Sequence, residues 1–180
     1  MRQIGYTLVE LSVVVLIVAV VAAAVIRSQT SADVAPTLDA AAEEVAAALR
    51  FARSEAVRTG EPHGVIASTS SQQVQVYLLD EAVSPPVVKY TVRHPVDKKL
   101  YDLNFATDTM LEPVTVTSAV FWYSGVLLPQ SFVGFNPDGT PKYNSSGTIV
   151  MLTSGAITLA AGGDTRMVSV APMTGRVTVQ

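Results

Sequence analysis

The sequence predicts an α+β fold in which a long N-terminal helix, with a membrane half and an amphipathic half, packs on an antiparallel β-sheet or sandwich. Three observations predict it. An apolar stretch lies near the start of the chain, apolar residues at helical spacing follow it, and from Gly64 onward the hydrophobic pattern has a period of two. Because a run of strands follows the helical residues without alternating with them, we expect the helix to cover a sheet face.

The first half of the predicted helix is a candidate membrane segment. Leu8 to Ile26 contains nineteen residues and a single charged side chain, Glu10. At 1.5 Å per residue, this length is close to the ~20 residues that cross a bilayer core. The whole chain is 49% hydrophobic with a mean hydropathy of +0.37, which is high for a soluble domain. We therefore expect a single-pass transmembrane or filament-core helix over residues 6–27.

Glu10 is a costly residue in such a helix. A carboxylate at the centre of a membrane helix costs at least ~2.5 kcal/mol, and less near the end. A buried charge of this kind is normally placed to meet a partner. The alternative is that Glu10 belongs to an ordinary anchor and reaches the lipid headgroups.

The second half of the predicted helix is amphipathic and runs from about residue 37 to residue 59. Pro36 is expected to kink or break a continuous helix, and Gly60 followed by Pro62 is typical of a helix end. The stripe is rich in alanine, which favours packing on a sheet. It consists of Leu38, Ala42, Val45, Leu49, Ala52 and Ala56.

A β domain is expected over about residues 64–180. Val74, Val76 and Leu78 alternate with polar residues, and further β-branched runs are separated by turn signals, among them Ser154-Gly155. His63 and His94 each lie beside a proline and are expected at the surface. The further predicted strands are Val87 to Arg93, Val114 to Phe121, Gly147 to Thr153, Ala156 to Leu159, Met167 to Ala171 and Arg176 to Val179.

Composition argues against several classes of protein. With no cysteine, the chain has no disulfide, no thiolate zinc site and no cysteine nucleophile. Charged residues make up 15% and the net charge is -3, which argues against a strongly basic nucleic-acid binder. No nucleophile elbow, phosphate-binding loop or dinucleotide fingerprint is present. We expect a protein that is not an enzyme and has no cofactor and no metal.

Four stretches of the sequence resemble one family. Gly5-Tyr6-Thr7-Leu8-Val9-Glu10-Leu11, at the start of the apolar helix, resembles the type III signal of type IV pilins and of the pseudopilins of type II secretion. The stretch from Leu49 to Val57 and the turn Phe135-Asn136-Pro137-Asp138-Gly139 are similar to the GspH/FimT group of minor pseudopilins and minor type IV pilins. The terminal hairpin around Gly175-Arg176-Val177 is also similar to that group.

The resemblance implies how the N-terminus is processed. In the family, a prepilin peptidase cuts between the residues that correspond to Gly5 and Tyr6 and methylates the new amine on Tyr6. Residues 1–5 are then a leader, and Glu10 is the fifth residue of the mature chain. Its implied role is to neutralise the N-terminal amine of an adjacent subunit in a filament.

The resemblance also implies a place in the cell and a set of partners. The expected location is the bacterial inner membrane, with the N-terminus cytoplasmic and residues 28–180 forming a periplasmic pilin-like domain. The implied partners are the prepilin peptidase, other pilins or pseudopilins, the inner-membrane assembly platform and membrane lipid. The implied function is a minor pseudopilin, a structural subunit that helps to initiate or cap a type II secretion pseudopilus or a type IV pilus.

Two alternatives remain open at this stage. One is a FimT-like minor pilin that binds DNA during natural transformation, with Arg176, Arg166 and Lys142 as candidate phosphate contacts. Thr178 stands where a second cation is expected, and residues 60–180 contain seven basic against nine acidic side chains, so we do not expect DNA as a partner. The other alternative is a membrane-anchored β domain that is never processed.

Overall fold

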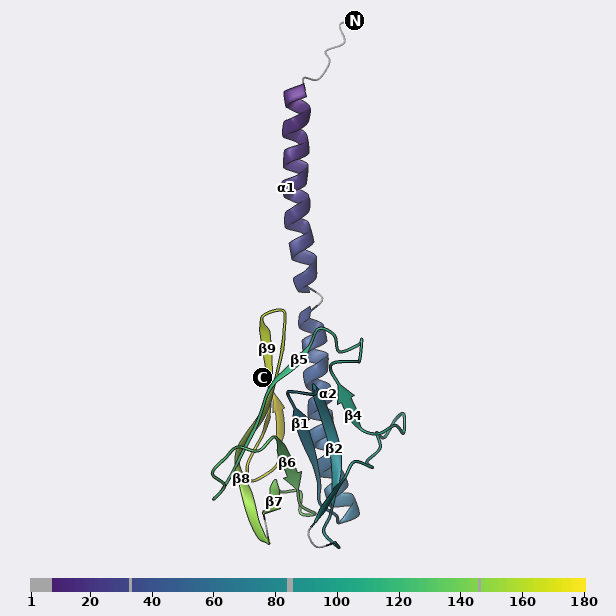
Figure 1. Ribbon diagram of the computed structural model, residues 1–180, viewed down its shortest axis with the longest axis vertical. Helices are drawn as coiled ribbons and strands as arrows, with labels where there is room; N and C mark the ends of the chain where they lie inside the picture. The colour runs from purple at the N-terminus through teal and green to yellow at the C-terminus, as the bar shows by residue number, and fades with distance from the viewer. Residues whose placement is uncertain (1–7, 33, 84–85, 146) are drawn as a thin grey trace, which may run out of the picture.

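The structure, a computed structural model, describes residues 8–32, 34–83, 86–145 and 147–180. Its two helices, α1 (Leu8–Ala32) and α2 (Val34–Thr59), follow one another along the long axis of the molecule. α1 projects away from the β domain, whereas α2 lies within it (Figure 1). The predicted α+β class, with an N-terminal helix packed on antiparallel sheets, is confirmed.

The structure has two separate helices, in line with the break expected near Pro36, but Pro36 itself lies inside the second one. Pro36 is the third residue of α2, and the helix begins at Val34, before the predicted start near residue 37. A proline is tolerated in the first helical turn because the first N–H groups have no intrahelical acceptor. The first helix also continues beyond Arg27, to Ala32.

Within the described residues, the strands form two five-stranded sheets in which all paired strands are antiparallel. The first sheet has the order β3-β2-β1-β6, with β4 also paired to β2, and the second has the order β10-β9-β8-β5, with β7 also paired to β8. The first sheet contains β1 (His63–Ser68), β2 (Gln73–Asp80), β3 (Val87–Lys89), β4 (Asp102–Asn104) and β6 (Phe132–Phe135). The second contains β5 (Thr115–Tyr123), β7 (Lys142–Ser145), β8 (Thr148–Ala161), β9 (Asp164–Val170) and β10 (Val177–Val179).

The turn predicted at Ser154-Gly155 is wrong. Both residues lie inside β8, which runs without interruption where two strands were expected. Gly155 pairs with Phe121 of β5, and a Cβ added to Gly155 would lie 2.2 Å from Cδ1 of Phe121. The glycine therefore makes room for a buried ring on the neighbouring strand.

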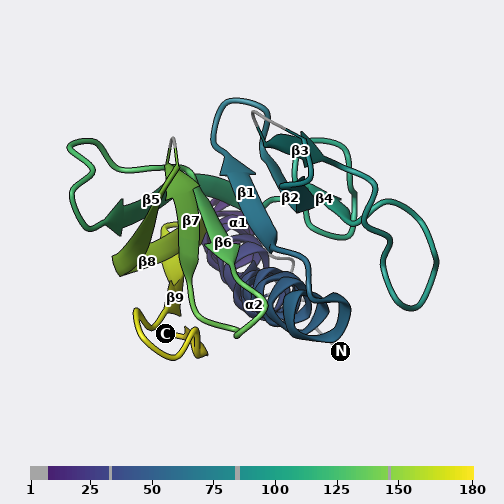
Figure 2. The ribbon, with the colours of Figure 1, turned by 90° about the horizontal axis from the view of Figure 1, so that it is seen from below.

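α2 forms the centre of the hydrophobic core. It contacts strands of both sheets, and Figure 2, which shows the molecule from below, places it alongside them. All six residues of the predicted stripe are buried, and so are Ala41, Ala46 and Ala48. The buried stripe is wider than predicted because the helix meets two sheets, and its alanines allow a close approach.

The surface position expected for His63 is also wrong. His63 is only 5% exposed, and its Nδ1 donates to the carbonyl oxygen of Glu61 at 2.8 Å. It is the first residue of β1, where the chain returns from the end of α2 and pairs with both β2 and β6. A strand with neighbours on both sides buries its side chains, and a flanking proline does not reveal this.

Candidate functional site

The predicted N-terminal site lies at the free end of α1. Gly5 and Tyr6 lie outside the described residues. Glu10 lies in the first turn of α1 and is exposed, and the Ser12 hydroxyl donates to the Leu8 carbonyl oxygen at 2.8 Å in the same turn. Glu10 therefore lies in the first turn of an apolar helix that projects away from the β domain (Figure 1).

The side chains of α1 are exposed as far as they are described, from Leu8 to Val21. Burying a Val, Leu or Ile side chain is worth about 1.5–3 kcal/mol, so covering such a helix is strongly favourable. The exposed large apolar side chains in this stretch are Leu8, Val9, Leu11, Val13, Val14, Val15, Leu16, Ile17, Val18, Val20 and Val21.

Among the residues whose side chains the structure describes, which in α1 end at Val21, no helix is both long and apolar enough to cross a membrane.

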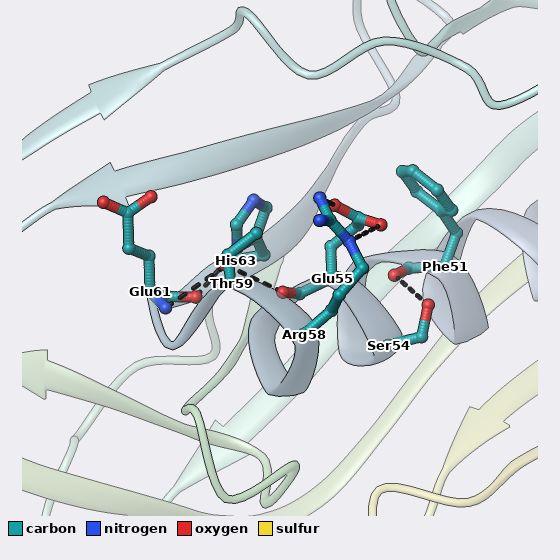
Figure 3. Close-up of polar contacts among 7 residues, drawn as sticks. All are labelled: Phe51, Ser54, Glu55, Arg58, Thr59, Glu61 and His63. Atoms are coloured by element: carbon teal, nitrogen blue, oxygen red, sulfur yellow. Dashed lines mark hydrogen bonds and ion pairs between the residues drawn. The ribbon is translucent and has the colours of Figure 1, made fainter.

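The other end of the helical region, at the C-terminus of α2, is held by local polar contacts (Figure 3). Arg58 donates to both carboxylate oxygens of Glu55, with Nε at 3.0 Å, and these bonds lower the pKa of Glu55. The Thr59 hydroxyl donates to the Glu55 carbonyl oxygen at 2.8 Å. Gly60 ends the helix in the left-handed region at φ 74°, as predicted, and its N–H donates to the Ala56 carbonyl oxygen at 3.1 Å.

Arg53 joins this part of α2 to two turns of the β domain. Its Nε donates to the Gly139 carbonyl oxygen at 3.0 Å. A Cβ added to Gly175 would lie 2.9 Å from the same carbonyl oxygen and 3.2 Å from Cδ of Arg53. The predicted turns at Asn136–Gly139 and Thr174-Gly175 are thus packed together against one arginine of the helix.

Two of the three candidate phosphate contacts are engaged in ion pairs. Nε of Arg166 lies 2.6 Å from a carboxylate oxygen of Asp39, and Nζ of Lys142 lies 2.6 Å from a carboxylate oxygen of Asp138. Hydrogen bonds from Lys142 and Thr140 lower the pKa of Asp138 to about 2.

The three candidate phosphate contacts also do not form a cluster. Arg176 lines a groove with Arg53, whereas Arg166 is paired with Asp39. Asp39 precedes Arg53 by fourteen residues, roughly 21 Å along a helix axis at 1.5 Å per residue. Arg166 and Arg176 therefore lie at opposite ends of the β domain, which does not favour a single DNA-binding face.

The groove beside Arg176 contains cations that the sequence reasoning missed. Arg50, Arg53 and Arg58 of α2 line it together with Arg176. The signal was present in the sequence, because Arg50, Arg53 and Val57 follow the i, i+3, i+7 spacing of one helix face. In residues 8–32, 34–83, 86–145 and 147–180, no group of three metal-ligating side chains could hold a metal ion.

Comparison with protein families identifies the two parts of the chain. Residues 1–26 match the prokaryotic N-terminal methylation motif, and residues 41–174 match the type II transport protein GspH. The chain belongs to the GspH family. The GspH match covers α2 and nearly all of the β domain, and the methylation motif covers the predicted leader and most of α1.

Solved structures of a minor pseudopilin share the fold. Two structures of the minor pseudopilin EpsH from the type II secretion system of Vibrio cholerae match with a TM-score of 0.50 each. The first has 14% sequence identity, and the match covers 79% of this chain and 95% of the EpsH chain. The second has 12% sequence identity, and the match covers 80% of this chain and 93% of the EpsH chain. The type IV minor pilin FimU of Pseudomonas aeruginosa matches at 21% identity, with 79% and 87% covered and a TM-score of 0.45. Comparison with curated protein sequences finds no match.

Proposed function

We propose that this GspH-family chain is a minor pseudopilin, a structural subunit that helps to initiate or cap a type II secretion pseudopilus or a type IV pilus. The observation that carries the proposal is an exposed apolar helix attached to a β domain whose core is already filled by its own second helix. The β domain buries its own core, whereas the apolar side chains of α1 need a partner to cover them. This arrangement suits a subunit that assembles with other subunits through α1. The chain does not need catalytic groups for this role.

The proposal includes processing of the N-terminus by a prepilin peptidase. We propose cleavage between Gly5 and Tyr6 and methylation of the amine of Tyr6, supported by the match of residues 1–26 to the methylation motif. In a strain with an active prepilin peptidase, intact-mass measurement is expected to show a methylated chain of 175 residues, the 180 of the sequence less the five of the leader. Recovery of the unprocessed chain, Met1 to Gln180, from the membrane fraction would contradict it.

Glu10 is proposed to act in assembly. When α1 packs among the helices of neighbouring subunits, the carboxylate enters surroundings of low dielectric constant, where an unpaired charge is expensive. The N-terminal amine of an adjacent subunit, carried by Tyr6 of its processed chain, supplies the opposite charge. Glu10→Ala is expected to leave cleavage intact and to reduce recovery of the chain in sheared filaments. Equal recovery of wild type and variant would exclude this role.

The membrane position completes the proposal. We propose that α1 holds the chain in the bacterial inner membrane as a single span before assembly, with a cytoplasmic N-terminus and a periplasmic β domain. The nineteen-residue stretch from Leu8 to Ile26 and the methylation motif support it. The inner-membrane assembly platform is the proposed partner that extracts the helix. Protease added to spheroplasts is expected to digest the β domain, and complete protection would contradict the topology.

A further inference from the structure

The arginine groove, defined by Arg50, Arg53, Arg58 and Arg176, lies between the last turns of α2 and the turn before β10. Its volume is about 490 Å³. None of the described residues that line it is acidic. Figure 2 shows the turn before β10, at the yellow end of the chain, close to α2. The groove thus concentrates basic side chains in a chain whose net charge is -3.

The four arginines differ in how far their hydrogen-bonding groups are already used. Arg50 and Arg58 form ion pairs with Glu43 and Glu55. The other two members of the groove keep donors available, and they are the ones that matter for binding.

The guanidinium group of Arg53 is held in place by one hydrogen bond, which uses only one of its nitrogens. Its Nε donates to the Gly139 carbonyl oxygen, which orients the guanidinium group, while within the described residues its two terminal nitrogens have no hydrogen-bond partner. The exposed side chain of Arg176 likewise has no hydrogen bond or ion pair with any described residue. The groove therefore presents the oriented guanidinium group of Arg53 and the guanidinium group of Arg176, which is bonded to no described residue.

Two guanidinium groups in one groove match the geometry of carboxylates. A guanidinium donates two parallel N–H bonds to the two oxygens of a carboxylate, and such charge-assisted pairs are strong and directional. Val57 lies on the same wall and is 56% exposed, which offers an apolar contact beside the charges. We propose that the arginine groove binds a segment of a partner protein that carries Asp or Glu side chains next to an apolar residue.

Charge distribution favours an acidic peptide over duplex DNA. Duplex DNA presents a long row of phosphates and needs cations spread along a face. Here Glu43 and Glu55 stand beside the groove arginines, and Arg166 is paired near the far end of α2. The proposed short segment needs only the donors of Arg53 and Arg176, whereas duplex DNA requires a longer face of unpaired cations.

The groove remains accessible when α1 is covered. It lies along the C-terminal half of α2, at the end of the β domain opposite to α1 (Figure 1). A partner can therefore occupy it while α1 is in a membrane or a filament, and the proposal holds whether or not the filament role does.

Titration of labelled peptides tests the proposal on the full chain in micelles of a neutral detergent. The probes are a peptide of alternating glutamate and alanine, the same peptide with glutamine, and a short duplex DNA. The glutamate peptide is expected to bind with salt-sensitive affinity, and the glutamine peptide is expected not to bind. Arg176→Gln is the decisive variant because its side chain has no other described contact to lose, and it is expected to weaken binding about tenfold or more.

The control is Arg93→Gln, which removes one cation outside the groove and is expected to leave peptide affinity unchanged. Arg53→Lys is a second test, because it keeps the charge and loses the fork geometry, and is expected to weaken binding less than Arg176→Gln combined with Arg53→Gln. Failure of the glutamate peptide to bind would overturn the proposal. Equal losses for Arg93→Gln and Arg176→Gln would also overturn it, as would tighter binding of duplex DNA than of the peptide.

Discussion

The two helices follow one another in the chain but satisfy their apolar surfaces in opposite ways. Leu49 of α2 is 0% exposed, and the apolar stripe of this helix is buried by the strands of both sheets. Val15 of α1 is 60% exposed, and every side chain described in this helix is exposed. The apolar side chains of α2 are therefore covered by residues of the same chain, whereas covering those of α1 requires a membrane or another chain.

The difference separates folding from assembly. Because α2 closes the core, the β domain has the contacts it needs without α1. Covering the α1 side chains is worth roughly tens of kcal/mol at about 1.5–3 kcal/mol each, before the costs of association. Changes in α2 are thus expected to affect stability, and changes in α1 to affect membrane insertion or assembly.

Removal of most of α1 is expected to have the largest effect. A chain that starts at Ser28 loses the exposed apolar side chains described in α1 and keeps the whole core. We expect it to be a soluble, folded monomer, whereas the full chain requires detergent. Sedimentation and circular dichroism measure both properties, and aggregation of the shortened chain without detergent would show that the β domain also needs α1.

Two alanine substitutions, one in each helix, test the difference between the helices directly. Leu49→Ala removes a fully buried side chain and is expected to lower the free energy of unfolding of the β domain by about 2–5 kcal/mol. Val15→Ala removes methyl groups from an exposed side chain and is expected to change it by less than about 0.5 kcal/mol. Denaturant unfolding in detergent measures both, and similar losses would contradict the separation.

Gly155 tests the packing of the second sheet. Gly155→Ala places a Cβ 2.2 Å from the present position of Phe121 Cδ1 and is expected to cost about 1–3 kcal/mol of stability. Adding Phe121→Leu is expected to recover part of the loss, since the smaller side chain leaves room. Ser154→Ala on the same strand is the control, and an equal loss from it would show that the Phe121 contact is not the cause.

Lowering the pH is expected to have the smallest effect on the stability of the fold. The effect arises in the turn at Asn136–Gly139, where the Gly139 carbonyl oxygen accepts the hydrogen bond from Arg53. The pKa of Asp138 is lowered from 3.8 to about 2 by Lys142 and Thr140, so its ionised form stabilises the fold above about pH 4 and this contribution is lost as the pH falls to 2. The Asp138 carboxylate is exposed, so Asp138→Asn is expected to cost at most about 1 kcal/mol at pH 6. The difference from wild type is expected to vanish near pH 2, and a difference that grows in acid would contradict this.

The sequence predicted the helices better than the strands. The stripe from Leu38 to Ala56 was readable because helical spacing repeats over five turns, and all six of its residues are buried. β4 and β6 were missed because they are short and pair with strands distant in the sequence, and β1 and β7 were missed although each pairs with the strand that follows it. Gly155 was misread as a turn because its role is set by Phe121 on another strand.

The candidate site could be predicted only where its residues are neighbours in the sequence. Glu10 in its apolar helix is such a case, and its role in assembly stays a prediction. The arginine groove needs Arg176 beside α2, more than a hundred residues earlier in the chain, and no local pattern indicates that contact. The pairing of Arg166 with Asp39 is equally long-range.

We propose that other subunits cover α1 in the assembled state while the β domain stays exposed to solvent. The chain has no cysteine, so single-cysteine variants report on one position each. In isolated filaments, Val15→Cys is expected to resist a water-soluble maleimide and to cross-link to a neighbouring subunit, whereas Leu127→Cys, at a position 93% exposed, is expected to be labelled rapidly. Equal labelling of the two cysteines in the filaments would contradict the claim.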